Sequence, residues 1–129
     1  MFYNSEIAKL LLRLTVGIMM LFHGIEKVIH GISGVKHLTT SAGLPEFFAY
    51  GVYIGEVIVP IFIILGLYAR IASLFLAINM MMAIFLAYGG SLFALGKFGA
   101  PVIELPLFYL VISIVIFLLG SGKYAVNSK

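Results

Sequence analysis

The 129-residue sequence contains no cysteine, and only 10% of its residues are charged. Without cysteine, the chain cannot form disulfides, use a thiol nucleophile, or supply thiolates to zinc or to an iron–sulfur cluster. Soluble domains usually carry about 25% charged residues, so this sequence has too few charges to cover a surface that faces water. Signatures of metalloproteases, nucleotide-binding proteins and serine hydrolases are also missing. Any redox chemistry therefore requires a bound cofactor or a partner.

What the chain does contain is apolar sequence, since 63% of its residues are hydrophobic and its mean hydropathy is +1.19. About 20 apolar residues are needed for each helix that crosses a bilayer. Four stretches satisfy this requirement: Ile7 to Val28, Phe47 to Leu67, Ile71 to Tyr88 and Val102 to Gly120. The sequence therefore predicts an all-α integral membrane protein, a four-helix transmembrane bundle forming a single domain over residues 1–129.

The basic residues bear on topology and on partners. They are dispersed and form no patch, so we expect the lipid bilayer and not nucleic acid as a partner. Four spans put both termini on one side, with five basic residues there (Lys9, Arg13, Arg70, Lys123, Lys129) against three on the other (Lys27, Lys36, Lys97). Both termini are therefore expected in the cytoplasm. The first apolar stretch resembles a signal peptide but lacks a small-residue cleavage site, so we expect a retained helix.

The long connection at residues 29–46 holds the polar segment Ser33 to Ser41, which can form a short turn or helix at the membrane surface. His23, His30 and His37 repeat at heptad spacing, as haem or metal ligands on one helix would. Glycines interrupt the helical pattern after His30, so the sequence does not favour haem. The methionines are better explained as core packing than as copper ligands, and no metal site is expected.

Glu56 is the strongest functional signal, because it lies nine residues after Phe47 and eleven before Leu67, near the middle of the second span. Pro60 lacks the N–H that would bond the Glu56 carbonyl. A carboxyl group and a free carbonyl at this depth require a polar partner, a cavity or a ligand. The structural alternative is a protonated Glu56 in one interhelical hydrogen bond. Asn79, midway along the third span, is the expected hydrogen-bond partner, with helix packing as its main role.

Arg13 shares one face of the first helix with Gly17, Gly24 and Lys27. Glycines allow close approach, so this face is expected to contact another helix. Arg13 either pairs with Glu56 or extends to the membrane surface, and the sequence leaves both possibilities open. For Lys27, extension to the surface is favoured.

A second polar group is expected near the outer surface. Glu104 lies in the first turns of the fourth helix, where the helix dipole favours a carboxylate. His23 and Lys27, one turn apart on the first helix, reach a similar level. The three side chains form either an interfacial salt bridge or a ligand site, and the sequence favours neither.

Seven short motifs occur in order along nearly the whole chain: Arg13-Leu14-Thr15-Val16-Gly17, His23-Gly24 with Lys27, Gly43-Leu44-Pro45, Gly55-Glu56-Val57, Gly66-Leu67-Tyr68-Ala69-Arg70, Glu104-Leu105 and Gly120-Ser121-Gly122. Together they resemble the DoxX family of small four-helix membrane proteins. The resemblance implies a bacterial-type inner membrane location and a link to redox complexes. It also adds Arg70, on the inner side, to the polar residues already selected. The chain departs from the family at its end, where an acidic residue often seen after the last helix is missing.

Two functions of different classes follow. In the first, the chain is a membrane subunit of an oxidoreductase system that binds a quinone or a small redox substrate between its helices. Glu56 would handle protons, and Arg13 or His23 would orient the ligand. In the second, the chain is a non-catalytic transporter of a small solute, or a docking factor for a soluble redox enzyme. The candidate residues are Arg13, His23, Lys27, Glu56, Asn79 and Glu104, and no catalytic residue or oligomeric state is assigned, although a homo-oligomer is compatible with either function.

Overall fold

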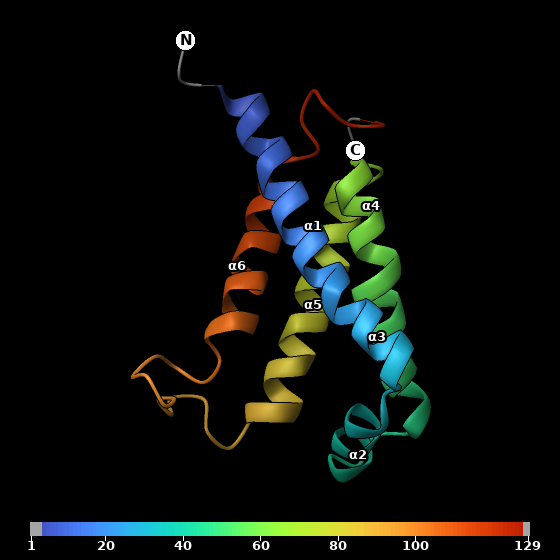
Figure 1. Ribbon diagram of the computed structural model, residues 1–129, viewed down its shortest axis with the longest axis vertical. Coiled ribbons are helices and arrows are strands. Elements are labelled where there is room, and N and C mark those ends of the chain that lie inside the picture. The colour runs from blue at the N-terminus through green and yellow to red at the C-terminus, as the bar shows by residue number, and fades with distance from the viewer. Residues whose placement is uncertain (1–3, 128–129) are drawn as a thin grey trace.

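A computed structural model describes residues 4–127 of the chain. Within this range the structure is helical and has no β-strand, only one isolated bridge between Leu95 and Pro101. The helices are α1 (Ser5–His30), α2 (Ser33–Ser41), η1 (Glu46–Tyr50), α3 (Gly51–Tyr53), η2 (Ile54–Ile58), α4 (Val59–Leu65), α5 (Ala69–Tyr88) and α6 (Glu104–Leu119). The long helical segments alternate in direction, and α1 begins at the same end of the molecule as the segment after α6 (Figure 1).

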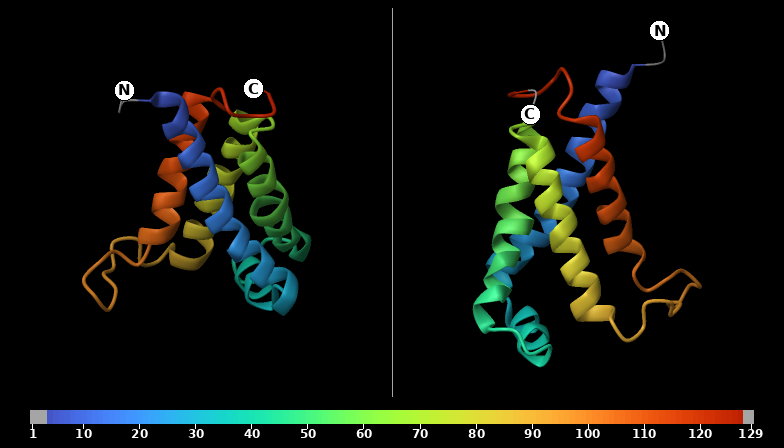
Figure 2. Two further views of the ribbon diagram at one scale, coloured as in Figure 1. Left: turned by 45° about the horizontal axis from the view of Figure 1, so that its top comes forward. Right: turned by 180° about the vertical axis from the view of Figure 1, so that it is seen from behind.

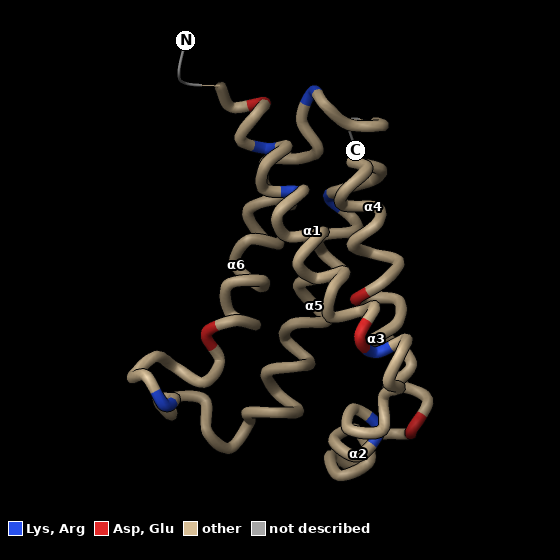
Figure 3. Tube along the Cα trace, viewed as in Figure 1, with Lys and Arg blue, Asp and Glu red and all other residues tan. Residues whose placement is uncertain are grey.

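Three helical segments are long and apolar enough to cross a membrane: α1, the continuous segment Glu46–Leu65, and α5. The fourth, α6, is apolar but has 16 residues. Large apolar side chains such as Phe22, Phe75 and Leu118 point outward from these helices, as expected of a surface that faces lipid. Most charged residues lie toward the two ends of the bundle (Figure 3). The predicted all-helical, membrane-type fold is confirmed at this level.

The helices begin and end a few residues away from the approximate limits of the four apolar stretches, for identifiable reasons. α1 begins earlier than Ile7, because the Asn4 side chain accepts hydrogen bonds from the second and third residues of the helix. The second segment ends at Leu65, because Gly66 adopts a left-handed conformation with φ +72°. α5 follows directly after the left-handed Tyr68. The last helix starts after the turn at residues 101–103.

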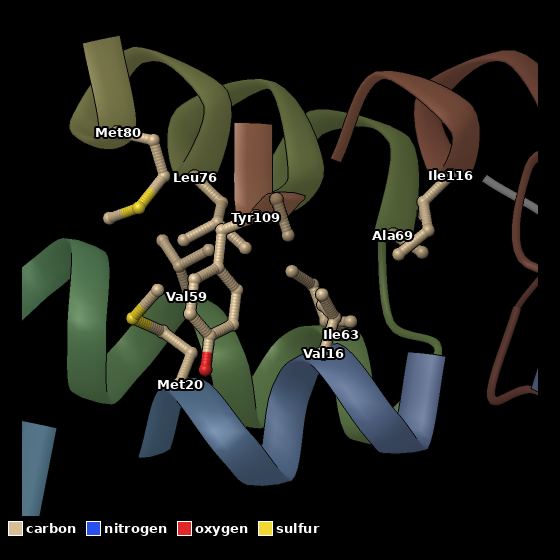
Figure 4. Close-up of a cluster of buried hydrophobic side chains, with 10 residues drawn as sticks. Val16, Met20, Val59, Ile63, Ala69, Leu76, Met80, Tyr109 and Ile116 are labelled. Carbon is tan, nitrogen blue, oxygen red and sulfur yellow. The ribbon is translucent and has the colours of Figure 1, made fainter. Parts of the chain in front are cut away.

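The core lies between α1, α4, α5 and α6, and ten buried side chains form it (Figure 4). Ala69, Ala72 and Ser73 of α5 are almost fully buried, as is Ser113 of α6. Small residues at these positions allow α5 and α6 to pack closely. The Ser73 and Ser113 hydroxyls donate to carbonyls of their own helices, at 2.9 and 2.6 Å, so burying them leaves no unpaired donor.

The predicted glycine face of α1 contacts the second span, which confirms that prediction. A Cβ atom built on Gly17 would lie 2.5 Å from a side-chain carbon of Ile64, and one on Gly24 would lie 1.9 Å from the Glu56 carbonyl oxygen. Gly51 and Gly55 are spaced four apart in the second span, as glycines at helix contacts often are. A Cβ on Gly55 would lie 2.6 Å from the side-chain amide carbon of Asn79 in α5. A Cβ on Gly51, in contrast, would meet nothing within 4 Å.

The polar segment between the first two spans forms a helix, α2, with the predicted limits Ser33 and Ser41. α2 lies at one end of the bundle, as the two further views also show (Figure 2). Lys36 joins it to η1 through a 3.5 Å ion pair with Glu46 and through the Tyr50 ring, 4.8 Å from the Lys36 nitrogen. Tyr50, and to a smaller extent Glu46, raise the pKa of Lys36 above its ordinary value.

Candidate functional site

The second span changes its helical form at Glu56. Residues 54–58 form a π-helical turn, in which the Val59 N–H donates to the Ile54 carbonyl, five residues earlier. Pro60 follows two residues after this turn and cannot donate to the carbonyl of Glu56. The Glu56 carbonyl thus lacks its usual N–H donor at the place where the backbone changes from α-helical to π-helical hydrogen bonding. Turns of this kind occur frequently at functional sites.

Glu56 is buried, with 6% of its surface exposed, and it has two polar partners. Its Oε1 accepts a 2.7 Å hydrogen bond from the Lys27 Nζ, and its Oε2 accepts a 3.4 Å bond from the Asn79 amide. The predicted Asn79 contact is confirmed. The expectation that Lys27 extends to the membrane surface was wrong, because a buried carboxylate attracts an ammonium group more strongly than the interface does.

Beside this ion pair lies a cavity of about 470 Å³ beneath α2, which we call the α2 cavity. Its wall comes from α1, α2, the segment 44–56 and α5. Four of its lining residues carry polar side chains, namely Lys27, Thr39, Glu56 and Asn79, and the others are apolar residues or glycine. The Thr39 hydroxyl already donates to the Val35 carbonyl at 2.8 Å. The polar groups that face this cavity are therefore concentrated at the Lys27–Glu56–Asn79 triplet.

A second hollow of about 320 Å³, the α6 hollow, lies between α1, α5 and α6. Lys27 and Glu56 line it as well. Its remaining polar residues are His23, Tyr88 and Tyr109. The His23 and Tyr109 rings meet edge to face, with their centroids 5.9 Å apart. The ion pair thus lines both spaces, as do Ala83 and Ala87 of α5.

Arg13 does not meet Glu56. Its side chain is 1% exposed and donates at 3.5 Å to the carbonyls of Ile63 and Ile64, at the end of α4, and also to the Tyr124 carbonyl after α6. Carbonyls at a helix C-terminus carry partial negative charge, so they compensate the guanidinium without a carboxylate. Arg13 is therefore neither paired with Glu56 nor extended to the surface, the two possibilities that the sequence left open.

The outer cluster of His23, Lys27 and Glu104 does not form. Glu104 occupies the first turn of α6, as predicted, but it is exposed and has no ion pair with any of residues 4–127. Lys27 is instead held by Glu56. Arg70 is exposed at the opposite end of the bundle, where its guanidinium lies about 3 Å from the position of a Cβ on Gly120.

Tyr109 lines the site and was missed by the sequence analysis. It is 8% exposed and shares the α6 hollow with Glu56. A signal was present, because Tyr109 and Ser113 are polar residues spaced four apart in a helix that is otherwise apolar after Glu104. That spacing puts both on one face, and a polar face on such a helix is expected to point into the bundle.

These features define a helical protein of membrane type with a partly buried ion pair that lines two hollows. The sequence model of the DoxX family matches residues 8–89, and the chain belongs to this family. A Bacillus subtilis (strain 168) protein named "Putative oxidoreductase CatD" is 36% identical over 81 residues. The match covers 63% of this chain and 60% of that protein, so less than two thirds of the relative's length is spanned. No solved structure matches the chain significantly.

Proposed function

We propose that the chain is a membrane subunit of an oxidoreductase system and that the α2 cavity binds a quinone or a similarly small redox molecule. Lys27 and Asn79 would hold an oxygen atom of the ligand, and Glu56 would exchange protons with it. The apolar wall would hold the ring and the start of its tail. The proposal assigns no role in ligand contact to Arg13, which lies at the end of α4.

The observation that carries this proposal is the composition of the α2 cavity. Sites for small molecules typically occupy about 300–1,000 Å³ and have mostly apolar walls with a few convergent polar groups. A cavity of about 470 Å³ with one buried ion pair and one amide fits that description. The name of the Bacillus subtilis relative supports the link to an oxidoreductase.

We further propose a single domain with four spans in a bacterial inner membrane and both termini in the cytoplasm. At 1.5 Å per residue, the 16 residues of α6 measure about 24 Å, somewhat less than the roughly 30 Å of a bilayer core. The turn at residues 101–103 and Gly120 would complete the crossing. The alternating direction of the segments supports this arrangement, because α6 then returns the chain to the side on which α1 begins (Figure 1).

Binding of decylubiquinone to the purified chain in lipid nanodiscs tests the proposal. We expect saturable binding to the wild-type protein and a loss of roughly tenfold to a hundredfold in affinity for Glu56→Gln, since a bond to a charged group contributes about 1.5–3 kcal/mol. A photoreactive azidoquinone should label residues of the cavity wall, such as Phe48 or Met82.

Glu26→Gln is the matched control, because Glu26 precedes Lys27 directly on α1 but is exposed and pairs with His30, at 3.3 Å, instead of with Lys27. The double variant Lys27→Met with Glu56→Met removes both charges and guards against misfolding caused by one unpaired charge. The proposal fails if the wild-type chain does not bind the quinone, or if Glu56→Gln binds it as tightly as Glu26→Gln does. Tight association with a purified soluble redox enzyme in the absence of quinone binding would favour a docking role.

A further inference from the structure

The two spaces beside the ion pair differ in the groups that can carry protons. In the α2 cavity, the titratable groups are Lys27 and Glu56 themselves, which are already bonded to each other. The α6 hollow adds three more, His23, Tyr88 and Tyr109. Of these five, only histidine ordinarily titrates near neutral pH. Among the residues that line the two spaces, the group suited to carry a proton at neutral pH is therefore His23, which lines the α6 hollow and not the α2 cavity.

The position of the α6 hollow connects it with one end of the bundle. Its lining includes Tyr88, the last residue of α5, and Val102, which precedes α6. The hollow therefore reaches the connection between these helices, at the end where the chain leaves α5. A volume of about 320 Å³ is sufficient for several water molecules, each of which occupies about 30 Å³ in the liquid.

We infer that Glu56 exchanges its proton with water through the α6 hollow and that the His23 imidazole is the relay. This inference deepens the proposed function, because it names the route by which protons reach the ligand site. A water molecule or buffer acid at the hollow's mouth protonates His23. The imidazolium then passes one proton to the Glu56 carboxylate and returns to neutral imidazole. The result is a neutral carboxylic acid, while Lys27 keeps its own proton.

The groups that surround Glu56 are compatible with this route. α1 contributes Lys27 and His23, α5 contributes the amide of Asn79 and the phenol of Tyr88, and α6 contributes the phenol of Tyr109. α2 and α4 present no titratable side chain to the two spaces. The contact of the Tyr109 ring with His23 makes Tyr109 a positioning residue, since it orients the imidazole.

Infrared difference spectroscopy after a pH jump measures this exchange on the full chain in nanodiscs, without any ligand. The carboxylic acid band that disappears in Glu56→Gln reports protonation of Glu56. We expect His23→Ala to slow its appearance roughly tenfold or more, to leave its midpoint pH unchanged, and to regain speed when free imidazole is added.

His30→Ala and His37→Ala are the matched controls, because all three histidines are exposed but only His23 lines the α6 hollow. They should leave the rate unchanged. The inference is overturned if His23→Ala exchanges at the wild-type rate, if it shifts the midpoint alone, if the controls slow the rate equally, or if Glu56 shows no titration while the fold is intact. If the wild-type chain does not bind quinone but His23→Ala still slows the protonation of Glu56, the proposed function is rejected and the proton route through His23 is retained.

Discussion

Gly24 brings the backbone of α1 against the second span at the candidate site. Its backbone lies against the carbonyl of Glu56, and a Cβ atom there would lie 1.9 Å from that oxygen. Backbone atoms on both sides of this contact cannot rotate away as a flexible side chain can. The approach also brings Lys27, three residues later on the same helix, within hydrogen-bond distance of the Glu56 carboxylate.

Replacing Gly24 with alanine should therefore separate α1 from η2. We expect Gly24→Ala to destabilise the fold by about 1–3 kcal/mol, the usual range for overpacking, and to weaken the Lys27–Glu56 pair. Thermal unfolding of the purified protein in detergent measures the loss. Gly34→Ala is the control, because a Cβ at Gly34 of α2 would meet nothing within 4 Å, and alanine favours a helix. Equal stability of Gly24→Ala and the wild type would contradict this packing.

The sequence predicted the contacts of some candidate side chains and not of others. Glu56 and its contact with Asn79 could be predicted, because a mid-span carboxyl needs a partner and Asn79 lies at a matching depth. The partner of Lys27 was not predictable from depth alone, since a lysine near a helix end can equally extend to the membrane surface. Arg13 was ambiguous for a similar reason. Its acceptors are backbone carbonyls of α4 and of the chain after α6, and such carbonyls leave no signature in the sequence.

Among the elements, the second span is the least regular, and its irregularity positions the carboxylate. It passes from a 3₁₀ turn through α3 and η2 into α4 within Glu46–Leu65. The apolar pattern predicted one helix here, and Pro60 predicted a local defect. Neither predicted a π-turn, because a proline predicts the loss of one backbone hydrogen bond but not the register that the helix then adopts.

Pro60→Ala should convert this defect into a regular helix. Alanine supplies the N–H that the Glu56 carbonyl lacks, and a regular turn would rotate the residues before it by about 100° relative to α4. We expect the helix itself to gain stability but the Lys27–Glu56 coupling energy to fall from about 0.5–3 kcal/mol toward zero. A double-mutant cycle with Lys27→Met and Glu56→Gln, in both backgrounds, measures this coupling.

Pro106→Ala is the control for that cycle. Pro106 is the third residue of α6, where a backbone N–H has no acceptor within the helix, so its replacement should leave the coupling unchanged. A Pro60→Ala protein with the wild-type coupling energy would show that the π-turn does not set the direction of Glu56.

In the molecule as a whole, the two ends of the bundle are built differently. The half nearer α2 holds the ion pair, the α2 cavity and the α6 hollow. The other end is closed by the C-terminal tail, residues 121–127. There the Lys123 N–H donates to the Glu6 carboxylate at 2.6 Å, and the Val126 N–H donates to the Leu65 carbonyl at 3.0 Å. Arg13 lies beneath the tail and joins its Tyr124 carbonyl to the end of α4.

Arg13→Lys should release this tail while preserving the buried charge. A guanidinium donates in several directions at once, whereas a lysine has a single nitrogen that cannot bridge α4 and Tyr124 in the same way. The loss of one bond to a charged group, about 1.5–3 kcal/mol, predicts roughly tenfold to a hundredfold faster trypsin cleavage after Lys123, measured by mass spectrometry of the released peptide. Arg70→Lys, at the same end but exposed, should leave the rate unchanged. Because Arg13 and Glu56 are not in contact, Arg13→Lys should also leave the proton exchange of Glu56 unchanged, and a slowed exchange would reveal coupling between the two ends of the bundle.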